Sequence, residues 1–388
     1  MSIRKMFRRE FLSKSAKTVV VAGFAGTTVR FAQDEKPAGT SKEQADKKAQ
    51  PEFRVLGKTG LKVTTVSYGA MRTRDEAIIH RALDLGINYI DTARVYMGGQ
   101  NEVTVGNVMK TRRKEVFVAT KFVPASTEDI LKSVETSLKS LQMDYVDVIQ
   151  AHGLDTVEQL KDESILEALR KVKKEGKARF VGFTTHKNMT ELVKAAISMK
   201  FYDTILVAYN FKSSPELTTA IEDAAKAGIG IVAMKTQAGG YTDTKMGELS
   251  PHQAALKWVL QNKGIANTIP SMVNYDQLSE DIQVMGSKMG WMDRKTLYRY
   301  SQAIDKTYCR MCGKCSGLCP KGVDVQDVNR SIMYHEGYRD AALAMTAYQS
   351  IPSKSRPSAC QTCESCSVQC AYGLNIHGKM RRAATLFV

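Results

Sequence analysis

From residue 53 to about residue 290, short runs of apolar and β-branched residues alternate with longer segments in which apolar residues recur every three or four positions. The short runs predict buried strands, and the longer segments predict amphipathic helices. Strands that alternate with helices favour a parallel sheet with crossover helices. The predicted strands cover residues 63–68, 88–92, 116–121, 146–152, 178–183, 204–210, 230–235 and 267–271.

Eight strands in about 230 residues match the size of a (β/α)8 TIM barrel, so we assign an α/β barrel to residues 53–290. Helices are predicted over 130–141, 163–175 and 215–227, and a hairpin at residues 53–61 is expected to close the barrel floor. Beyond the barrel, residues 291–388 form a second, smaller region with a helical stretch expected from residue 324 to about residue 349.

Polar side chains collect where the predicted strands end. The second strand ends with Asp91, and Tyr96 lies in the loop after it, while Lys121 ends the third strand and His152 ends the fourth. In a TIM barrel, the carboxyl ends of the strands carry the chemistry. A candidate active site is therefore expected at this end, although an ordinary buried ion pair between Asp91 and Lys121 would also fit the pattern.

Over residues 53–284 the sequence resembles the aldo-keto reductases. The resemblance rests on the segments RVLGKTGL, INYIDTARVY, ATK, QAHGLD and LKWVLQN. It implies a catalytic tetrad of Asp91, Tyr96, Lys121 and His152. In that family pattern Tyr96 exchanges a proton with the substrate, Lys121 lowers the tyrosine's ordinary pKa of ~10, Asp91 holds the lysine, and His152 donates to the substrate oxygen.

The same resemblance implies a nicotinamide cofactor, with the choice between NAD and NADP open. Met234 stands where many members of the family place an aromatic residue, and Ser271 occupies one position where some members use a basic residue for the 2′-phosphate. The candidate cofactor-binding residues are Thr184, Thr185, Lys235, Gln277, Glu280 and Asp281.

All eight cysteines fall in two runs of the form CxxCxxCxxxC, one at Cys309, Cys312, Cys315 and Cys319 and the other at Cys360, Cys363, Cys366 and Cys370. This spacing is typical of two 4Fe-4S clusters, as in two-cluster bacterial ferredoxins, where the fourth cysteine of each run binds the other cluster. Zinc sites and disulfides are the alternatives, but triplets at this spacing suit neither well. The long segment between the runs favours a mainly α-helical ferredoxin-like domain.

The formal net charge is +16, and part of it lies in the first fifty residues, which hold 11 lysines and arginines against 5 aspartates and glutamates. No basic run is interleaved with aromatic residues, so a nucleic-acid partner is not expected. Arg8 and Arg9 precede Phe11 and Leu12, and an apolar stretch follows, which resembles a twin-arginine export signal over residues 1–32. Residues 33–52 are expected to be a disordered linker, and a basic disordered N-terminus is the alternative reading of the signal.

These features predict an exported, periplasmic or otherwise extracytoplasmic oxidoreductase, with the signal segment cut or kept as a membrane tether. The barrel would interconvert a carbonyl and an alcohol by nicotinamide hydride transfer, and the clusters would pass electrons to a redox partner protein or a quinone-linked carrier. Hydride transfer moves two electrons, each cluster accepts one, and no flavin site is recognisable. The alternative is an electron-transfer or docking subunit with a non-catalytic, nucleotide-binding barrel.

Overall fold

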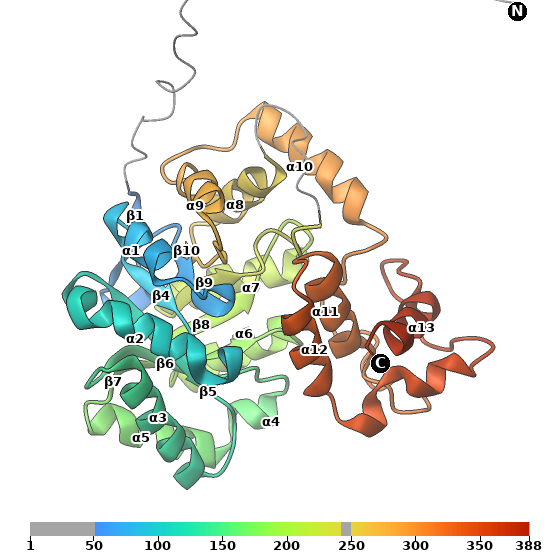
Figure 1. The fold of residues 1–388 in the computed structure, drawn as a ribbon, viewed down its shortest axis with the longest axis horizontal. Helices are drawn as coiled ribbons and strands as arrows, with labels where there is room; N and C mark the ends of the chain where they lie inside the picture. Colours follow the sequence, from blue (N-terminus) through green and yellow to red (C-terminus); the bar gives the residue numbers. More distant parts are fainter. Residues whose placement is uncertain (1–50, 242–249, 388) are drawn as a thin grey trace, which may run out of the picture. The chain divides into compact units, whose positions relative to one another are not determined.

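The computed structural model describes residues 51–241 and 250–387, and the predicted signal and most of the predicted linker lie outside them. Its centre is an eight-stranded, wholly parallel sheet in the order β10-β9-β8-β7-β6-β5-β4-β3 (Figure 1). A parallel bridge between Val66 and Thr268 joins the two edges and closes the barrel. The strands are β3 (Tyr68–Gly69), β4 (Tyr89–Asp91), β5 (Phe117–Phe122), β6 (Val146–Ala151), β7 (Ala178–Thr185), β8 (Thr204–Ala208), β9 (Gly230–Met234) and β10 (Ile265–Thr268).

The predicted barrel is confirmed, but the first predicted strand, 63–68, is wrong as a single element. Its first part belongs to β2 (Lys62–Thr64), which pairs antiparallel with β1 (Phe53–Val55) in the floor hairpin. Its last residue begins β3, the short first strand of the barrel. The unbroken β-branched run hides this division, because periodicity shows that residues are extended but not which partner they pair with.

Capping residues mark the starts of several barrel helices. Ser126 accepts a hydrogen bond from the backbone N–H of Asp129 at the start of α3, and Ser214 caps α7 in the same way, with Pro215 at the first helical position. The helices of this region are α1 (Glu76–Asp84), α2 (Gln100–Arg112), α3 (Thr127–Leu141), α4 (Val157–Leu160), α5 (Glu163–Lys174), α6 (Met189–Met199), α7 (Pro215–Lys226), α8 (Pro251–Gln261) and α9 (Tyr275–Ile282), with short 3-10 turns η1 (Gly57–Thr59), η2 (Ala70–Arg72), η3 (Tyr96–Gly99) and η4 (Arg113–Glu115).

The C-terminal region is helical, as expected, and its apolar core also includes Ala254 and Ala255 of α8. The single helical stretch predicted over 324–349 is wrong, because the chain breaks between α11 and α12. Gly337 ends α11, and a Cβ atom there would lie 2.1 Å from the carbonyl oxygen of Gly239, so only glycine allows this close approach to the barrel. The elements are α10 (Trp291–Ile304), α11 (Val325–Glu336), α12 (Ala341–Gln349), η5 (Ser353–Ser355), η6 (Pro357–Gln361) and α13 (Ile376–Leu386).

Apolar packing organises the described residues into a barrel core, a smaller core at the barrel floor and a core in the C-terminal region. In Figure 1, α11 and α12 lie beside the barrel, and α13 lies on their far side. Among the described residues, no helix combines the length and apolar character needed to cross a bilayer.

Candidate active site at the barrel mouth and the two cysteine loops

Asp91, at the end of β4, and Lys121, on the neighbouring strand β5, form a buried ion pair. The Lys121 ammonium also donates a hydrogen bond to the carbonyl oxygen of Thr92 at 2.6 Å, and Gln150 donates to the second carboxylate oxygen of Asp91 at 3.4 Å. Burial raises the pKa of Asp91 and lowers that of Lys121, so each residue needs the other to stay charged. The predicted pairing of Asp91 with Lys121 is therefore present.

Tyr96 is the first residue of η3, and its ring lies next to the Asp91–Lys121 ion pair. The Lys121 Nζ atom lies 5.0 Å from the centre of the Tyr96 ring, over its face. Burial raises the pKa of Tyr96 well above its ordinary value, and the charges of Asp91, Tyr334 and Tyr338 raise it further. In the net pKa of Tyr96, burial and these facing groups therefore outweigh the lowering expected from Lys121, whose effect on this tyrosine stays a prediction.

His152, which follows β6, meets the Tyr96 ring edge to face at a centroid distance of 5.9 Å. Burial lowers the pKa of His152 to about 3, helped by the positive charges of Lys121, Arg330 and Lys235. The imidazole is therefore neutral at ordinary pH and keeps one N–H to donate. His186, which the sequence analysis did not single out, also lines the pocket, and burial lowers its pKa well below the ordinary value.

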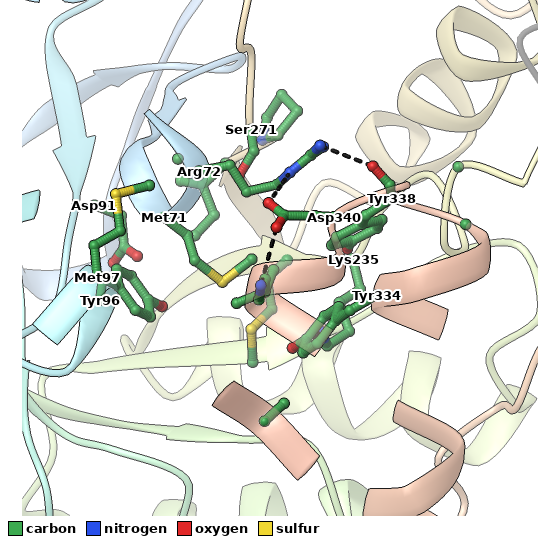
Figure 2. A pocket seen from close by; sticks show the side chains of 18 of the residues that line it. Met71, Arg72, Asp91, Tyr96, Met97, Lys235, Ser271, Tyr334, Tyr338 and Asp340 are labelled. Atoms are coloured by element: carbon green, nitrogen blue, oxygen red, sulfur yellow. Dashed lines mark hydrogen bonds and ion pairs between the residues drawn. The ribbon is translucent and has the colours of Figure 1, made fainter. Parts of the chain in front are cut away.

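These side chains border a pocket of about 1120 Å³, larger than most sites for small ligands. Figure 2 shows Asp91, Tyr96 and Met97 on one side of this pocket and Lys235, Tyr334 and Tyr338 on the other. The size and mixed polar and apolar lining fit an extended ligand that spans the barrel mouth.

The cofactor candidates divide into two groups in the structure. Lys235, Gln277, Glu280 and Asp281 line the pocket. Asp281 accepts a hydrogen bond from the side chain of Gln237 at 2.9 Å, and burial raises its pKa well above the ordinary value. The segment after β10 therefore presents polar groups to the same space as Tyr96, which fits a bound dinucleotide.

Thr184 and Thr185 are fully buried at the end of β7 and are not among the residues that line the pocket. Their hydroxyl groups have protein partners. Thr184 accepts from the backbone N–H of Gly153 at 2.8 Å, and Thr185 donates to the carbonyl oxygen of Lys187 at 2.7 Å. Their expected role in cofactor binding stays a prediction.

The C-terminal region supplies one wall of the pocket, which the sequence analysis missed. Arg330 and Tyr334 from α11, and Tyr338 and other residues just after it, reach the pocket. Arg72, on the barrel side, donates to the carbonyl oxygen of Tyr338 at 2.8 Å and pairs with Asp340 at 3.4 Å, as Figure 2 shows. No local pattern identifies these contacts, because each joins residues more than 250 positions apart.

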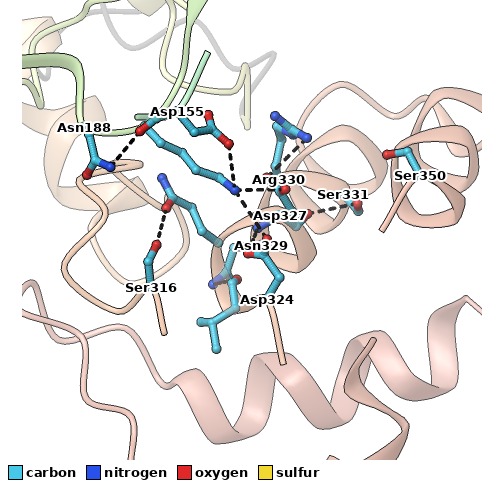
Figure 3. A network of polar contacts seen from close by, with 12 residues as sticks. Asp155, Asn188, Ser316, Asp324, Asp327, Asn329, Arg330, Ser331 and Ser350 are labelled. Atoms are coloured by element: carbon cyan, nitrogen blue, oxygen red, sulfur yellow. Dashed lines mark hydrogen bonds and ion pairs between the residues drawn. The ribbon is translucent and has the colours of Figure 1, made fainter. Parts of the chain in front are cut away.

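A second connection lies beside the pocket. Lys187 contacts Asp155 of the barrel at 3.4 Å and both Asp324 and Asp327 of the C-terminal region at 3.3 and 3.0 Å. Figure 3 shows these three carboxylates near Arg330, which pairs with Asp327 at 3.2 Å. A charged network thus links the barrel to α11 next to the candidate active site.

The cysteines lie in two groups that cross the two runs. Cys309, Cys312, Cys315 and Cys370 line one small pocket. Burial raises the pKa of Cys309 to about 12, and the three other thiols of this pocket raise it as well.

The second group contains Cys360 and the three cysteines that affect its pKa. Burial raises its pKa, as do Cys319, Cys363 and Cys366. The fourth cysteine of each run therefore lies with the other run, the arrangement that the ferredoxin spacing implies. All eight cysteines are in the described part of the chain, and none is in a disulfide there.

Within residues 51–241 and 250–387, no three His, Cys, Asp or Glu side chains meet closely enough to hold a single metal ion. A 4Fe-4S cluster has a different requirement, because four thiolates surround the cluster and each binds its own iron.

Comparison with known proteins agrees with the barrel. Residues 65–249 match the aldo/keto reductase family. L-Galactose dehydrogenase from Arabidopsis thaliana is 38% identical over 154 residues, which are 34% of this chain and 48% of that protein. An uncharacterized oxidoreductase from Bacillus subtilis is 36% identical over 149 residues, with the same coverage of 34% and 48%.

The fold agrees as well. An aldo-keto reductase from Bacillus halodurans, in its holo form, superimposes with a TM-score of 0.56 at 24% identity, covering 64% of this chain and 96% of that one. The chain spans about half the length of the curated relatives it matches. Residues 65–249 thus lie in an eight-stranded parallel barrel of the aldo-keto reductase type.

Proposed function

We propose that this chain is a NAD(P)-dependent oxidoreductase that interconverts a carbonyl and an alcohol at the barrel mouth. The observation that carries this proposal is the assembly of Asp91, Lys121, Tyr96 and His152 beside one large pocket. The match of residues 65–249 to the aldo/keto reductase family and the similarity to L-galactose dehydrogenase support it. The nicotinamide supplies or accepts the hydride when it is bound.

The side chains of this chain have distinct tasks in that reaction. Neutral His152 donates its N–H to the substrate oxygen and holds the carbonyl next to Tyr96. Tyr96 gives its hydroxyl proton to the oxygen as negative charge develops there. The Asp91–Lys121 pair places a cation against the Tyr96 ring and stabilises the tyrosinate that this transfer leaves.

We further propose that the C-terminal region carries two 4Fe-4S clusters. The groups that would hold them are Cys309, Cys312, Cys315 and Cys370 in one site and Cys319, Cys360, Cys363 and Cys366 in the other. The small pocket lined by the first group and the mutual effects on the thiol pKa values support this assignment. The clusters would exchange single electrons with a redox partner protein or a quinone-linked carrier.

Export through the twin-arginine route is part of the same proposal. It rests on Arg8, Arg9, Phe11 and Leu12 and the apolar stretch after them. A protein with preassembled clusters must cross the membrane folded, and this route allows that. A fusion of residues 1–50 to a reporter that is active only when exported folded tests the signal, with Arg8→Lys combined with Arg9→Lys as the matched control.

The test of the catalytic proposal is the Tyr96→Phe variant, assayed without oxygen with NADH and NADPH across a panel of aldehydes, ketones and alcohols. Loss of the hydroxyl removes the proton donor, so turnover should fall about 10²-fold or more while the cluster absorbance stays unchanged. Tyr298→Phe is the control, because this tyrosine is 66% exposed. Undiminished turnover in Tyr96→Phe would remove the tetrad from the mechanism.

A further inference from the structure

A second tyrosine and lysine meet in the candidate active site. The Nζ atom of Lys235, directly after β9, lies 3.0 Å from the hydroxyl oxygen of Tyr334 on α11. The same Nζ atom is 4.8 Å from the centre of the Tyr334 ring. The lysine comes from the barrel and the tyrosine from the C-terminal region, and both line the pocket that Tyr96 borders (Figure 2).

The two tyrosine–lysine pairs differ in which part of the tyrosine side chain the lysine ammonium contacts. Lys121 lies over the Tyr96 ring and gives its hydrogen bonds to Asp91 and Thr92. Lys235 instead donates directly to the Tyr334 oxygen, the atom that carries the charge of a tyrosinate. The geometry therefore stabilises a tyrosinate at Tyr334 more directly than at Tyr96.

The charges around Tyr334 act in the same direction. Burial by itself would raise the pKa of Tyr334, and Asp327 adds to that effect, but Lys235 and Arg330 outweigh both and lower it. Tyr338, just beyond the end of α11, packs its ring against that of Tyr334 at a centroid distance of 5.3 Å, with the ring planes tilted by 36°. Across the pocket, the charge of Tyr334 contributes to the raised pKa of Tyr96.

We propose that Tyr334, held by Lys235, is a proton-relay residue that returns a proton to Tyr96 after each reduction. This inference rests on the proposed function of the barrel. The Tyr96 O–H bond breaks as the proton passes to the substrate oxygen, which leaves a tyrosinate at Tyr96. The Tyr334 O–H bond then breaks and its proton passes, through water in the pocket, to Tyr96. The tyrosinate left at Tyr334 takes a proton from solvent, so no net charge is gained or lost.

The direction of transfer follows from the two environments. A buried phenol with facing negative charges is a weak acid, and its tyrosinate is a strong base. A phenol next to two cations is the stronger acid, so transfer from Tyr334 to Tyr96 is downhill. In the oxidation of an alcohol the same groups act in reverse, and Tyr334 passes the released proton to solvent.

The first test is a spectroscopic titration of the full protein, with its clusters, through the ultraviolet band of tyrosinate. The wild-type protein should show one tyrosine that ionises below the ordinary value of ~10. That step should be absent in Tyr334→Phe, should move upward in Lys235→Met, and should persist in Tyr338→Phe, the matched control just after the same helix. Absence of the step in the wild type, or its persistence in Tyr334→Phe, would overturn the proposal.

The second test separates a relay from a structural role. Turnover of Tyr334→Phe in weak buffer should fall about tenfold or more, and a small diffusible acid such as imidazolium should restore it, whereas Tyr96→Phe should not be restored. Unchanged turnover, or a loss that imidazolium does not restore, would overturn the relay. A wild-type protein that reduces no carbonyl would refute the proposed function itself, and the relay with it, while the titration would still show whether the Tyr334–Lys235 pair exists.

Discussion

The Nζ atom of Lys187, just after β7, lies 3.0 Å from the Oδ2 atom of Asp327 on α11, and this ion pair joins the barrel to the C-terminal region. Only 12% of the Lys187 side chain is exposed, and three carboxylates surround it. Burial alone would lower the pKa of Lys187, but Asp327, Asp155 and Asp324 outweigh this effect and raise it. The pair therefore holds α11, and with it Tyr334, against the barrel mouth.

Replacing Lys187 by methionine should detach α11, which forms one wall of the pocket, from the barrel. The variant leaves three carboxylates without their common cation, which should cost about 1–3 kcal/mol in the free energy of unfolding. Denaturant unfolding measures this loss, and Lys132→Met, in an exposed ion pair, is the control. Because the pKa of Lys187 is raised, its contribution should be complete below ~10.4 and should disappear only as the pH rises through the raised value. Equal stability of the Lys187 and Lys132 variants would contradict the role given to this ion pair.

A substitution at Gly337 tests whether the close approach of α11 to the barrel shapes the pocket. Alanine at this position would place a Cβ atom 2.1 Å from the Gly239 carbonyl oxygen, so α11 must shift. We expect the Gly337→Ala variant to lose about 1–3 kcal/mol and to bind nucleotide more weakly. At Gly290 the nearest atom to an added Cβ is 3.5 Å away, so Gly290→Ala should leave nucleotide affinity unchanged. Nucleotide affinity, measured by fluorescence, should separate the two variants. Equal affinities would show that α11 does not shape the pocket.

The iron content of cysteine variants shows which cysteines bind the same cluster. Replacement of Cys370 by alanine should remove one cluster, about four irons. If Cys309 and Cys370 share a cluster, the double alanine variant of these two should lose no more iron than either single variant. The double variant of Cys366 and Cys370 should instead lose both clusters. The opposite pattern would mean that each run binds its own cluster.

Acid should destabilise the barrel through its buried histidines. An unfolded histidine takes up a proton below about 6.5, whereas His152 resists protonation down to about 3. The unfolded state therefore binds more protons in this window, and the free energy of unfolding should fall as the pH drops from 6.5 towards 3. Between pH 7 and 5, His152→Gln should reduce the slope by up to about 1 kcal/mol per pH unit. A slope that matches the wild type would contradict the burial of a neutral imidazole.

Local signals in the sequence predict most of the barrel. Short apolar runs and apolar residues at three-and-four spacing identify its strands and helices, and polar residues at the strand ends, together with the family resemblance, identify Asp91, Tyr96, Lys121 and His152. Two kinds of feature are beyond such signals. The division of 63–68 between hairpin and barrel depends on pairing partners, and the wall formed by α11 depends on contacts between distant segments.

Electrostatics explains the other difference between expectation and structure. A lysine near a tyrosine predicts a lowered pKa, but the net shift depends on burial and on the other nearby charges as well as on whether the ammonium faces the hydroxyl or the ring. At Tyr96 it faces the ring, and at Tyr334 it faces the hydroxyl. Spacing along the chain places both lysines at strand ends and does not distinguish these geometries, so the role of Lys235 becomes visible only with α11 in place.

The proposed function requires the barrel pocket to hold a nicotinamide dinucleotide for redox chemistry. The most direct measurement is to purify the full protein without oxygen, denature it and identify any released nucleotide by mass spectrometry, with saturable binding of NADH and NADPH measured on the native protein. We expect either about one NAD or NADP per chain or saturable binding of one of the two reduced nucleotides. A protein that releases no dinucleotide and binds neither NADH nor NADPH would contradict the claim.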